Sequence, residues 1–187
     1  MTNTMIESVT FKLTGITPLI FNNLELNIPT PFAMCKLEEG PRELTSEQKQ
    51  AIIKSKGHFC QGHPAIPTIN IRKGLEGIGS AIQVKGLTSL KKFVQDNLVT
   101  CREAYALIEP RTCKYDTRWD RINVGGKKGS QMLICRPILE LLWSATVTVE
   151  YMSPVKQSHI IEAMNRLGIA GIGSYKTNYG HFSVEKV

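Results

Sequence analysis

The chain has 187 residues, of which 42% are hydrophobic and 21% are charged, a composition typical of one folded domain with room for insertions. Its formal net charge of +7 at pH 7 favours an anionic partner. The longest apolar stretch, residues 138–149, is interrupted by Glu140 and is too short to span a bilayer, so we expect no membrane partner.

Hydrophobic periodicity predicts six principal elements. Apolar and polar residues alternate through 8–15, as in a half-buried strand, whereas Ile71, Leu75 and Ile78 recur at helical spacing. In chain order the elements are a strand at 8–14, a helix at 68–82, a strand at 104–108, a strand at 141–151, a helix at 153–167 and a strand at 180–186.

This order predicts an α+β fold of the ferredoxin-like or RRM type, in which two helices cover one face of an antiparallel sheet. The whole chain, residues 1–187, forms one such domain. The segments outside the pattern are predicted insertions at about 20–64, 84–103 and 111–131. Within the first of these, Thr45 or Ser46 is expected to cap a short helix.

The third insertion begins a strongly basic stretch. Residues 111–136 hold two anions and seven cations, the cations being Arg111, Lys114, Arg118, Arg121, Lys127, Lys128 and Arg136. A local excess of this kind predicts a face that binds nucleic acid. The alternative is a solvated loop held by salt bridges. The glycines and lysines at 125–129 predict the tip of a hairpin.

A glycine-rich segment joins the last helix to the last strand. Glycine lets backbone N–H groups approach phosphates, and Tyr175, Tyr179 and Trp119 are predicted to stack on bases. The alternative is a tight connection with packed tyrosines. The segment follows a helix and opens a strand, which excludes the dinucleotide fingerprint. The predicted nucleic-acid-binding residues are Lys114, Arg118, Trp119, Arg121, Lys127, Lys128, Arg136, Tyr175, Lys176 and Tyr179.

Metal binding and catalysis have weaker signals. His58, Cys60 and His63 are weak candidates for metal ligands, but no second ligand pair at conventional spacing follows. We therefore predict no metal and no cofactor. His181 could take a proton from a ribose hydroxyl and is the alternative catalytic residue. No Ser-His-Asp order, P-loop or paired-carboxylate motif stands out, so we predict that the protein is not an enzyme.

The five cysteines favour a reducing compartment, because their number is odd, their spacing is irregular and none forms CxxC. The sequence begins without the basic, apolar and small residues of a secretory signal. We therefore expect free thiols and a cytoplasmic location.

Several of these segments together resemble the RAMP superfamily, the RRM-fold proteins of CRISPR backbone and crRNA-processing subunits. The resembling segments are residues 9–19, 65–72, 136–151 and 171–182. The last is similar to an AGIGSxxxxYGxF-like motif that ends small uncharacterised phage proteins. The resemblance implies that the 111–131 insertion touches nucleic acid as a thumb or palm loop, and that subunits assemble side by side. The chain lacks a clear second RRM unit and a catalytic histidine pair, which favours binding over cleavage.

We therefore predict a non-catalytic, phage- or mobile-element-encoded protein that binds single-stranded DNA or RNA as a homo-oligomer, in the host cytoplasm if a phage encodes it. The sheet and the glycine-rich loop would hold the nucleic-acid backbone. One alternative is a metal-independent RAMP-type endoribonuclease that uses His181. Another is a protein-interaction module that imitates a CRISPR backbone subunit.

Overall fold

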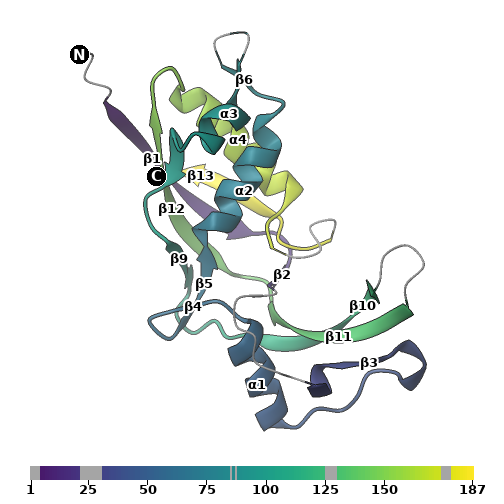
Figure 1. Ribbon diagram of the computed structural model, residues 1–187. Helices are drawn as coiled ribbons and strands as arrows, with labels where there is room; N and C mark the ends of the chain where they lie inside the picture. The colour runs from purple at the N-terminus through teal and green to yellow at the C-terminus, as the bar shows by residue number, and fades with distance from the viewer. Residues whose placement is uncertain (1–4, 22–30, 85, 87, 125–129, 174–177) are drawn as a thin grey trace.

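A computed structural model describes residues 5–21, 31–84, 86, 88–124, 130–173 and 178–187. Two parts are visible in Figure 1. A large sheet with helices on one side forms the upper part, and a smaller sheet with a long curved hairpin lies below it. The two parts meet near β2, close to the glycine-rich segment.

The large sheet has the strand order of a ferredoxin-like fold, with the last strand beside the first. The first strand pairs antiparallel with both of its neighbours. Along the sheet the strands are β13 (Phe182–Lys186), β1 (Ile6–Gly15), β12 (Ser144–Met152), β9 (Tyr105–Glu109), β5 (His63–Pro67) and β4 (Phe59–Cys60), and β8 (Val99–Cys101) also pairs with β12. The predicted α+β fold class is confirmed.

Two helices, α2 (Thr68–Gly79) and α4 (Gln157–Ala170), cover one face of this sheet (Figure 1). Val9, Phe11 and Leu13 point into the core beneath them, and all three are buried. The helices approach closely at Gly74, where an added Cβ would lie 2.4 Å from a methyl carbon of Leu167. This contact explains why α2 contains a residue of low helix propensity. A third helix, α3 (Leu90–Gln95), packs beside α2.

The predicted helix at 68–82 ends three residues early, at Gly79. Ile82 belongs to the same apolar stripe, but its N–H donates to the Gly79 carbonyl in a turn. It remains buried in the core. A buried side chain just beyond a helix therefore extended the periodic pattern past the true end. The short strands β6 (Gln83–Val84) and β7 (Thr88–Ser89) then lead to α3.

The smaller sheet is built from two of the predicted insertions together. The basic stretch forms a hairpin of β10 (Asp116–Val124) and β11 (Ser130–Leu139), and β11 also pairs with β2 (Leu19–Ile20) and β3 (Met34–Lys36). The helix α1 (Ser46–Lys56) packs on this sheet. Its capping box, formed by Thr45 and Gln48, confirms the predicted start of the helix.

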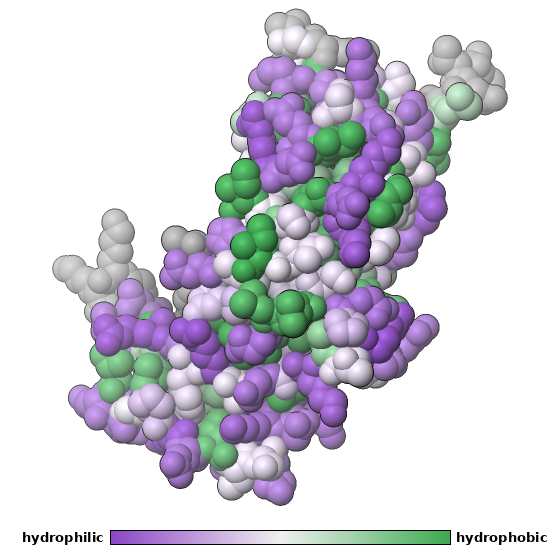
Figure 2. All heavy atoms as spheres, turned by 180° about the vertical axis from the view of Figure 1, so that it is seen from behind, coloured by the Kyte–Doolittle hydropathy of each residue, from purple (hydrophilic) through white to green (hydrophobic). Residues whose placement is uncertain are grey.

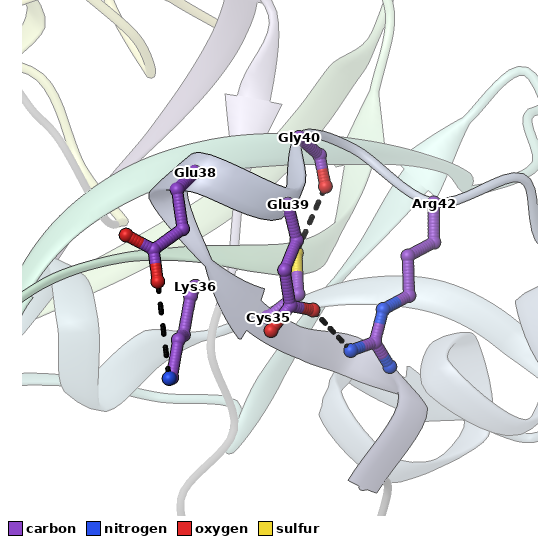
Figure 3. Close-up of polar contacts among 6 residues, drawn as sticks. All are labelled: Cys35, Lys36, Glu38, Glu39, Gly40 and Arg42. Atoms are coloured by element: carbon purple, nitrogen blue, oxygen red, sulfur yellow. Dashed lines mark hydrogen bonds and ion pairs between the residues drawn. The ribbon is translucent and has the colours of Figure 1, made fainter.

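Two short 3₁₀ helices flank β3: η1 (Pro31–Ala33) precedes the strand, and η2 (Leu37–Glu39) begins the turn that follows it. Figure 3 shows Cys35 Sγ donating to the Gly40 carbonyl at 3.1 Å and Arg42 paired with Glu39. Gly40 has a positive φ of 72°, and an added Cβ would meet no atom within 4 Å. This turn is open enough to serve as a reference site for glycine substitution.

All five cysteines lie in the described part of the chain, and each is a free thiol, as predicted. Burial raises the pKa of Cys101 to about 12, so this thiol stays protonated at neutral pH. No helix in the described ranges is long and apolar enough to cross a membrane.

Candidate nucleic-acid interface

The β10–β11 hairpin sorts the predicted basic residues onto two faces. Side chains alternate along a strand, and the register places Arg118 opposite Arg136 and Trp119 opposite Cys135. Arg118, Arg136 and Asp120 therefore share one face of the hairpin. Trp119 and Arg121 lie on the other face. The sequence analysis treated these residues as one cluster, whereas the strand period separates them.

Arg118 joins the hairpin to the glycine-rich segment. Its guanidinium carbon lies 4.9 Å from the centre of the Tyr179 ring, which is the geometry of a cation–π contact. The Arg118 side chain remains 48% exposed. The basic stretch and the glycine-rich segment were predicted to bind nucleic acid together, and here one residue of each lies against the other. A cation and an aromatic ring side by side suit a phosphate and its base.

Asp120 lies beside Arg118 on the same face. Arg118 Nε is 3.3 Å from Asp120 Oδ1, and the Asp120 side chain is only 11% exposed. Burial raises the pKa of this carboxyl group above its ordinary value, while the positive charges of Arg118 and Arg136 act in the opposite direction. The face thus carries a carboxylate within a group of cations.

Lys56, at the end of α1, adds a third cation that the sequence analysis missed. Its Nζ donates to the Cys135 carbonyl at 3.4 Å. Burial, and next the charge of Arg136, lower the pKa of Lys56. Both causes act against the charged form of this amine, so an anion that approached it would stabilise the charge. No sequence pattern marks Lys56, because α1 lies far from the basic stretch in the chain.

The glycines of the segment fit it tightly against its own chain. Gly173 and Gly180 have positive φ values of 82° and 74°, and an added Cβ would lie 2.5 Å from the Ile20 carbonyl oxygen and 1.9 Å from the Ile172 carbonyl oxygen, respectively. The N–H of Ile172 donates to the Gly180 carbonyl, and that of Gly180 donates to the Pro18 carbonyl. These N–H groups are therefore occupied within the protein, which corrects the expectation that they face phosphates.

Four predicted binding residues lie outside the described part of the chain. They are Lys127, Lys128, Tyr175 and Lys176. Lys114 precedes β10 and is exposed, as is Arg121 on the second face of the hairpin. The described residues that come together on the first face are Arg118, Arg136, Asp120 and Tyr179. Lys56 approaches from the end of α1 closely enough for the charge of Arg136 to act on it.

Trp119 occupies a different environment from the one predicted. It packs against a small hydrophobic cluster of Ala33, Ile52 and Cys135 beneath α1. It also lines a surface depression of about 390 Å³ together with Arg42 and Lys49. Any stacking of a base on Trp119 would therefore be separate from the Arg118–Tyr179 face.

His181 is held by the backbone around it. Its Nδ1 lies 2.6 Å from the Ile169 carbonyl oxygen, and its backbone N–H donates to Thr17 Oγ1 at 2.9 Å. Because a carbonyl oxygen only accepts, Nδ1 carries the hydrogen and Nε2 keeps its lone pair. This tautomer has the form of a general base, so the geometry leaves the alternative catalytic role open.

The weak metal candidates lie on the β4–β5 hairpin. Cys60 and His63 are paired across it, and the His58 ring packs edge-on against Phe21 at a centroid distance of 5.0 Å. Among the described residues, no group of three His, Cys, Asp or Glu side chains could hold a metal ion.

The outer face of the large sheet is a poor surface for stacking bases. In the fully described strands β1 and β12, the outward positions hold no aromatic residue, whereas RRM proteins stack bases on aromatic side chains of this face. Thr10 and Thr148 instead share a hydrogen bond at 3.1 Å, and Arg102 is paired with Glu150 at 2.7 Å. The hairpin and the glycine-rich segment are therefore the better candidates than the sheet, which we also expected to hold the backbone.

Comparisons with known proteins place the fold. No protein-family model matches the chain, and no curated protein matches its sequence. Among solved structures, a chain from the "Cryo-EM structure of the Type III-B Cmr-beta bound to cognate target RNA" is similar, with a TM-score of 0.61, 14% identity and 97% of this chain covered. This chain spans 61% of the length of that one. The likeness supports the RRM-like fold.

Proposed function

We propose that this protein binds single-stranded RNA through the face formed by Lys56, Arg118, Arg136 and Tyr179, and that it does not cleave the RNA. The observation that carries the proposal is the 4.9 Å contact of Arg118 with the Tyr179 ring, which unites the basic hairpin and the glycine-rich segment. The likeness in fold to a chain from a complex bound to target RNA favours RNA over DNA.

The chemistry of the face suits such a ligand. Three cations would neutralise phosphates and release counterions, which is the main source of affinity for a nucleic-acid backbone. Tyr179 would stack on a base, with a contribution of about 1–3 kcal/mol that depends little on sequence. Asp120 partly offsets the positive charge but leaves it in excess.

The proposal extends to the class of protein and its assembly. A RAMP-type subunit encoded by a phage or mobile element would line copies up along one RNA strand. Exposed hydrophobic side chains such as Ile16, Leu142 and Ile169 support contact between copies. The face of the molecule in Figure 2 also shows apolar surface across its middle, with hydrophilic surface above and below.

A metal-independent endoribonuclease is the second candidate, because the contact of His181 Nδ1 with the Ile169 carbonyl leaves Nε2 as the basic nitrogen of the neutral ring. In that case Nε2 would accept the proton of a ribose 2′-hydroxyl as this oxygen attacks the adjacent phosphorus, the bond from phosphorus to the 5′-oxygen would break, and the leaving 5′-oxygen would take a proton from water. The products would be a 2′,3′-cyclic phosphate and a 5′-hydroxyl. The positive charge of the neighbouring hairpin would assist. Binding and cleavage are separated by recovering the RNA after incubation.

The test is a titration of labelled single-stranded RNA at about 50 mM and about 200 mM salt in the presence of EDTA. Three phosphate contacts on a single strand predict a slope of about −2 for log affinity against log salt, and therefore a loss of about 20-fold between the two conditions. The RNA should be recovered intact. No binding at low salt would contradict the proposal. Cleavage by the wild type that is absent in His181→Ala would replace it with the nuclease.

A further inference from the structure

One carboxylate oxygen of Asp120 is buried and has no hydrogen-bond partner among the described residues. Oδ1 faces Arg118 Nε at 3.3 Å, but Oδ2 is inaccessible to solvent and has no hydrogen-bond donor among the described residues. Leaving a buried polar group unsatisfied costs about 1–3 kcal/mol. The carboxylate also opposes the cations that would bind phosphate. Asp120 is therefore unfavourable both for folding and for binding an anion, unless a ligand supplies the missing donor.

A single-stranded RNA offers few kinds of donor to this oxygen. Its phosphates only accept hydrogen bonds, so the donors are the ribose 2′-hydroxyl and the N–H groups of the bases. A base stacked on Tyr179 would turn the face of its ring, and not its N–H groups, toward the protein. The sugar attached to that base would then lie beside the hairpin. One free carboxylate oxygen matches one hydroxyl, and a carboxylate that accepts from a ribose 2′-hydroxyl is an established mode of recognition.

Arg118 is paired with the other oxygen of the Asp120 carboxylate, Oδ1, at 3.3 Å. It contacts both the Tyr179 ring and Asp120 and is 48% exposed, so it has room to turn outward. We infer that Arg118 leaves Asp120 to pair with a phosphate of the bound strand. Asp120 Oδ2 then accepts a hydrogen bond from the adjacent ribose 2′-hydroxyl. The face thereby selects RNA over DNA. This inference rests on the proposed function and assigns the preference for RNA to Asp120.

The test compares three oligonucleotides of one sequence, with ribose, 2′-deoxyribose or 2′-fluororibose sugars. The 2′-fluoro strand keeps the RNA-like sugar conformation but has no donor at this position. The wild-type protein should bind the ribose strand at least about tenfold more tightly than either of the others, as expected for a hydrogen bond to a charged group. Equal affinity for the ribose and 2′-fluoro strands would overturn the inference and leave the proposed function standing.

Variants then assign the effect to Asp120. Asp120→Ala should bind all three strands with similar affinity, whereas Asp116→Ala should keep the preference for ribose. Asp116 is a matched control, because it is an exposed aspartate on the same face of the same strand. Asp120→Asn, which keeps the shape of the side chain, replaces the alanine variant if that variant does not fold. A ribose preference that survives loss of the carboxylate would contradict the role of Asp120. No binding of any strand by the wild type would contradict the proposed function itself.

Discussion

Replacing Arg118 with glutamine is expected to weaken binding of single-stranded RNA by at least about tenfold, the effect of losing a specific arginine contact. The variant loses a positive charge from the hairpin and the cation–π contact with Tyr179. The slope of log affinity against log salt concentration should also become less negative by about 0.7, because one phosphate contact is lost. Equilibrium titrations of labelled RNA at several salt concentrations measure both changes.

Arg102→Gln is the matched control for this variant. Arg102 is 53% exposed and is paired with Glu150 at 2.7 Å, so it resembles Arg118 in exposure and in having a carboxylate partner. It differs in lying at the large sheet, away from Tyr179. Its affinity for RNA should stay within about twofold of the wild type, as expected for an arginine outside the binding face. Equal losses in the two variants would mean that only total charge matters, which would contradict a defined face.

Gly180→Ala is expected to lower the free energy of unfolding by about 3 kcal/mol or more, because it combines a steric clash with backbone strain. The added Cβ would lie 1.9 Å from the Ile172 carbonyl oxygen, at a positive φ of 74°. The chain must then shift where Gly180 donates to the Pro18 carbonyl. Because Tyr179 is the adjacent residue, the variant should also lose RNA affinity. Urea denaturation followed by circular dichroism measures the stability.

Gly40→Ala is the control that measures the cost of backbone strain without a steric clash. Gly40 has a similar φ of 72°, but an added Cβ meets no atom within 4 Å. Its substitution should cost about 1–3 kcal/mol, because φ 72° with ψ 175° is a conformation that only glycine adopts readily. If Gly180→Ala is no more destabilising than Gly40→Ala, that result would contradict the close contact between Gly180 and the Ile172 carbonyl oxygen.

The large sheet could be predicted because its strands bury one face only. In β1 the alternation of Val9, Phe11 and Leu13 with polar residues marks the strand without any knowledge of its partners. The smaller sheet could not be predicted in the same way. Its strands β2 and β3 have two and three residues, which is too short to show a period. The order of helices and strands therefore identified the RRM-like part and left the rest as insertions.

The sequence predicted that the basic stretch and the glycine-rich segment form one binding site, but not which of their residues meet. Charge density pointed to Arg118, and glycine density pointed to the segment that holds Tyr179, but no pattern relates two residues so far apart in the chain. No sequence pattern points to Lys56, because it lies at the end of α1, in a different insertion from the basic stretch. Trp119 is a different case, because an aromatic residue within a basic stretch suggests stacking, and its packing against the cluster beneath α1 could not be read from the sequence. Only the strand register assigns Arg118 and Trp119 to opposite faces.

The most direct test of the central claim is ultraviolet cross-linking of single-stranded RNA to the protein, followed by mass spectrometry of the linked peptides. The Arg118–Tyr179 face predicts cross-links at Tyr179 and in the hairpin peptide that contains Arg118. The outer face of β1 and β12, around Thr10 and Thr148, should give none. Cross-links confined to that outer face, with none at Tyr179 or in the hairpin, would contradict the proposed binding face.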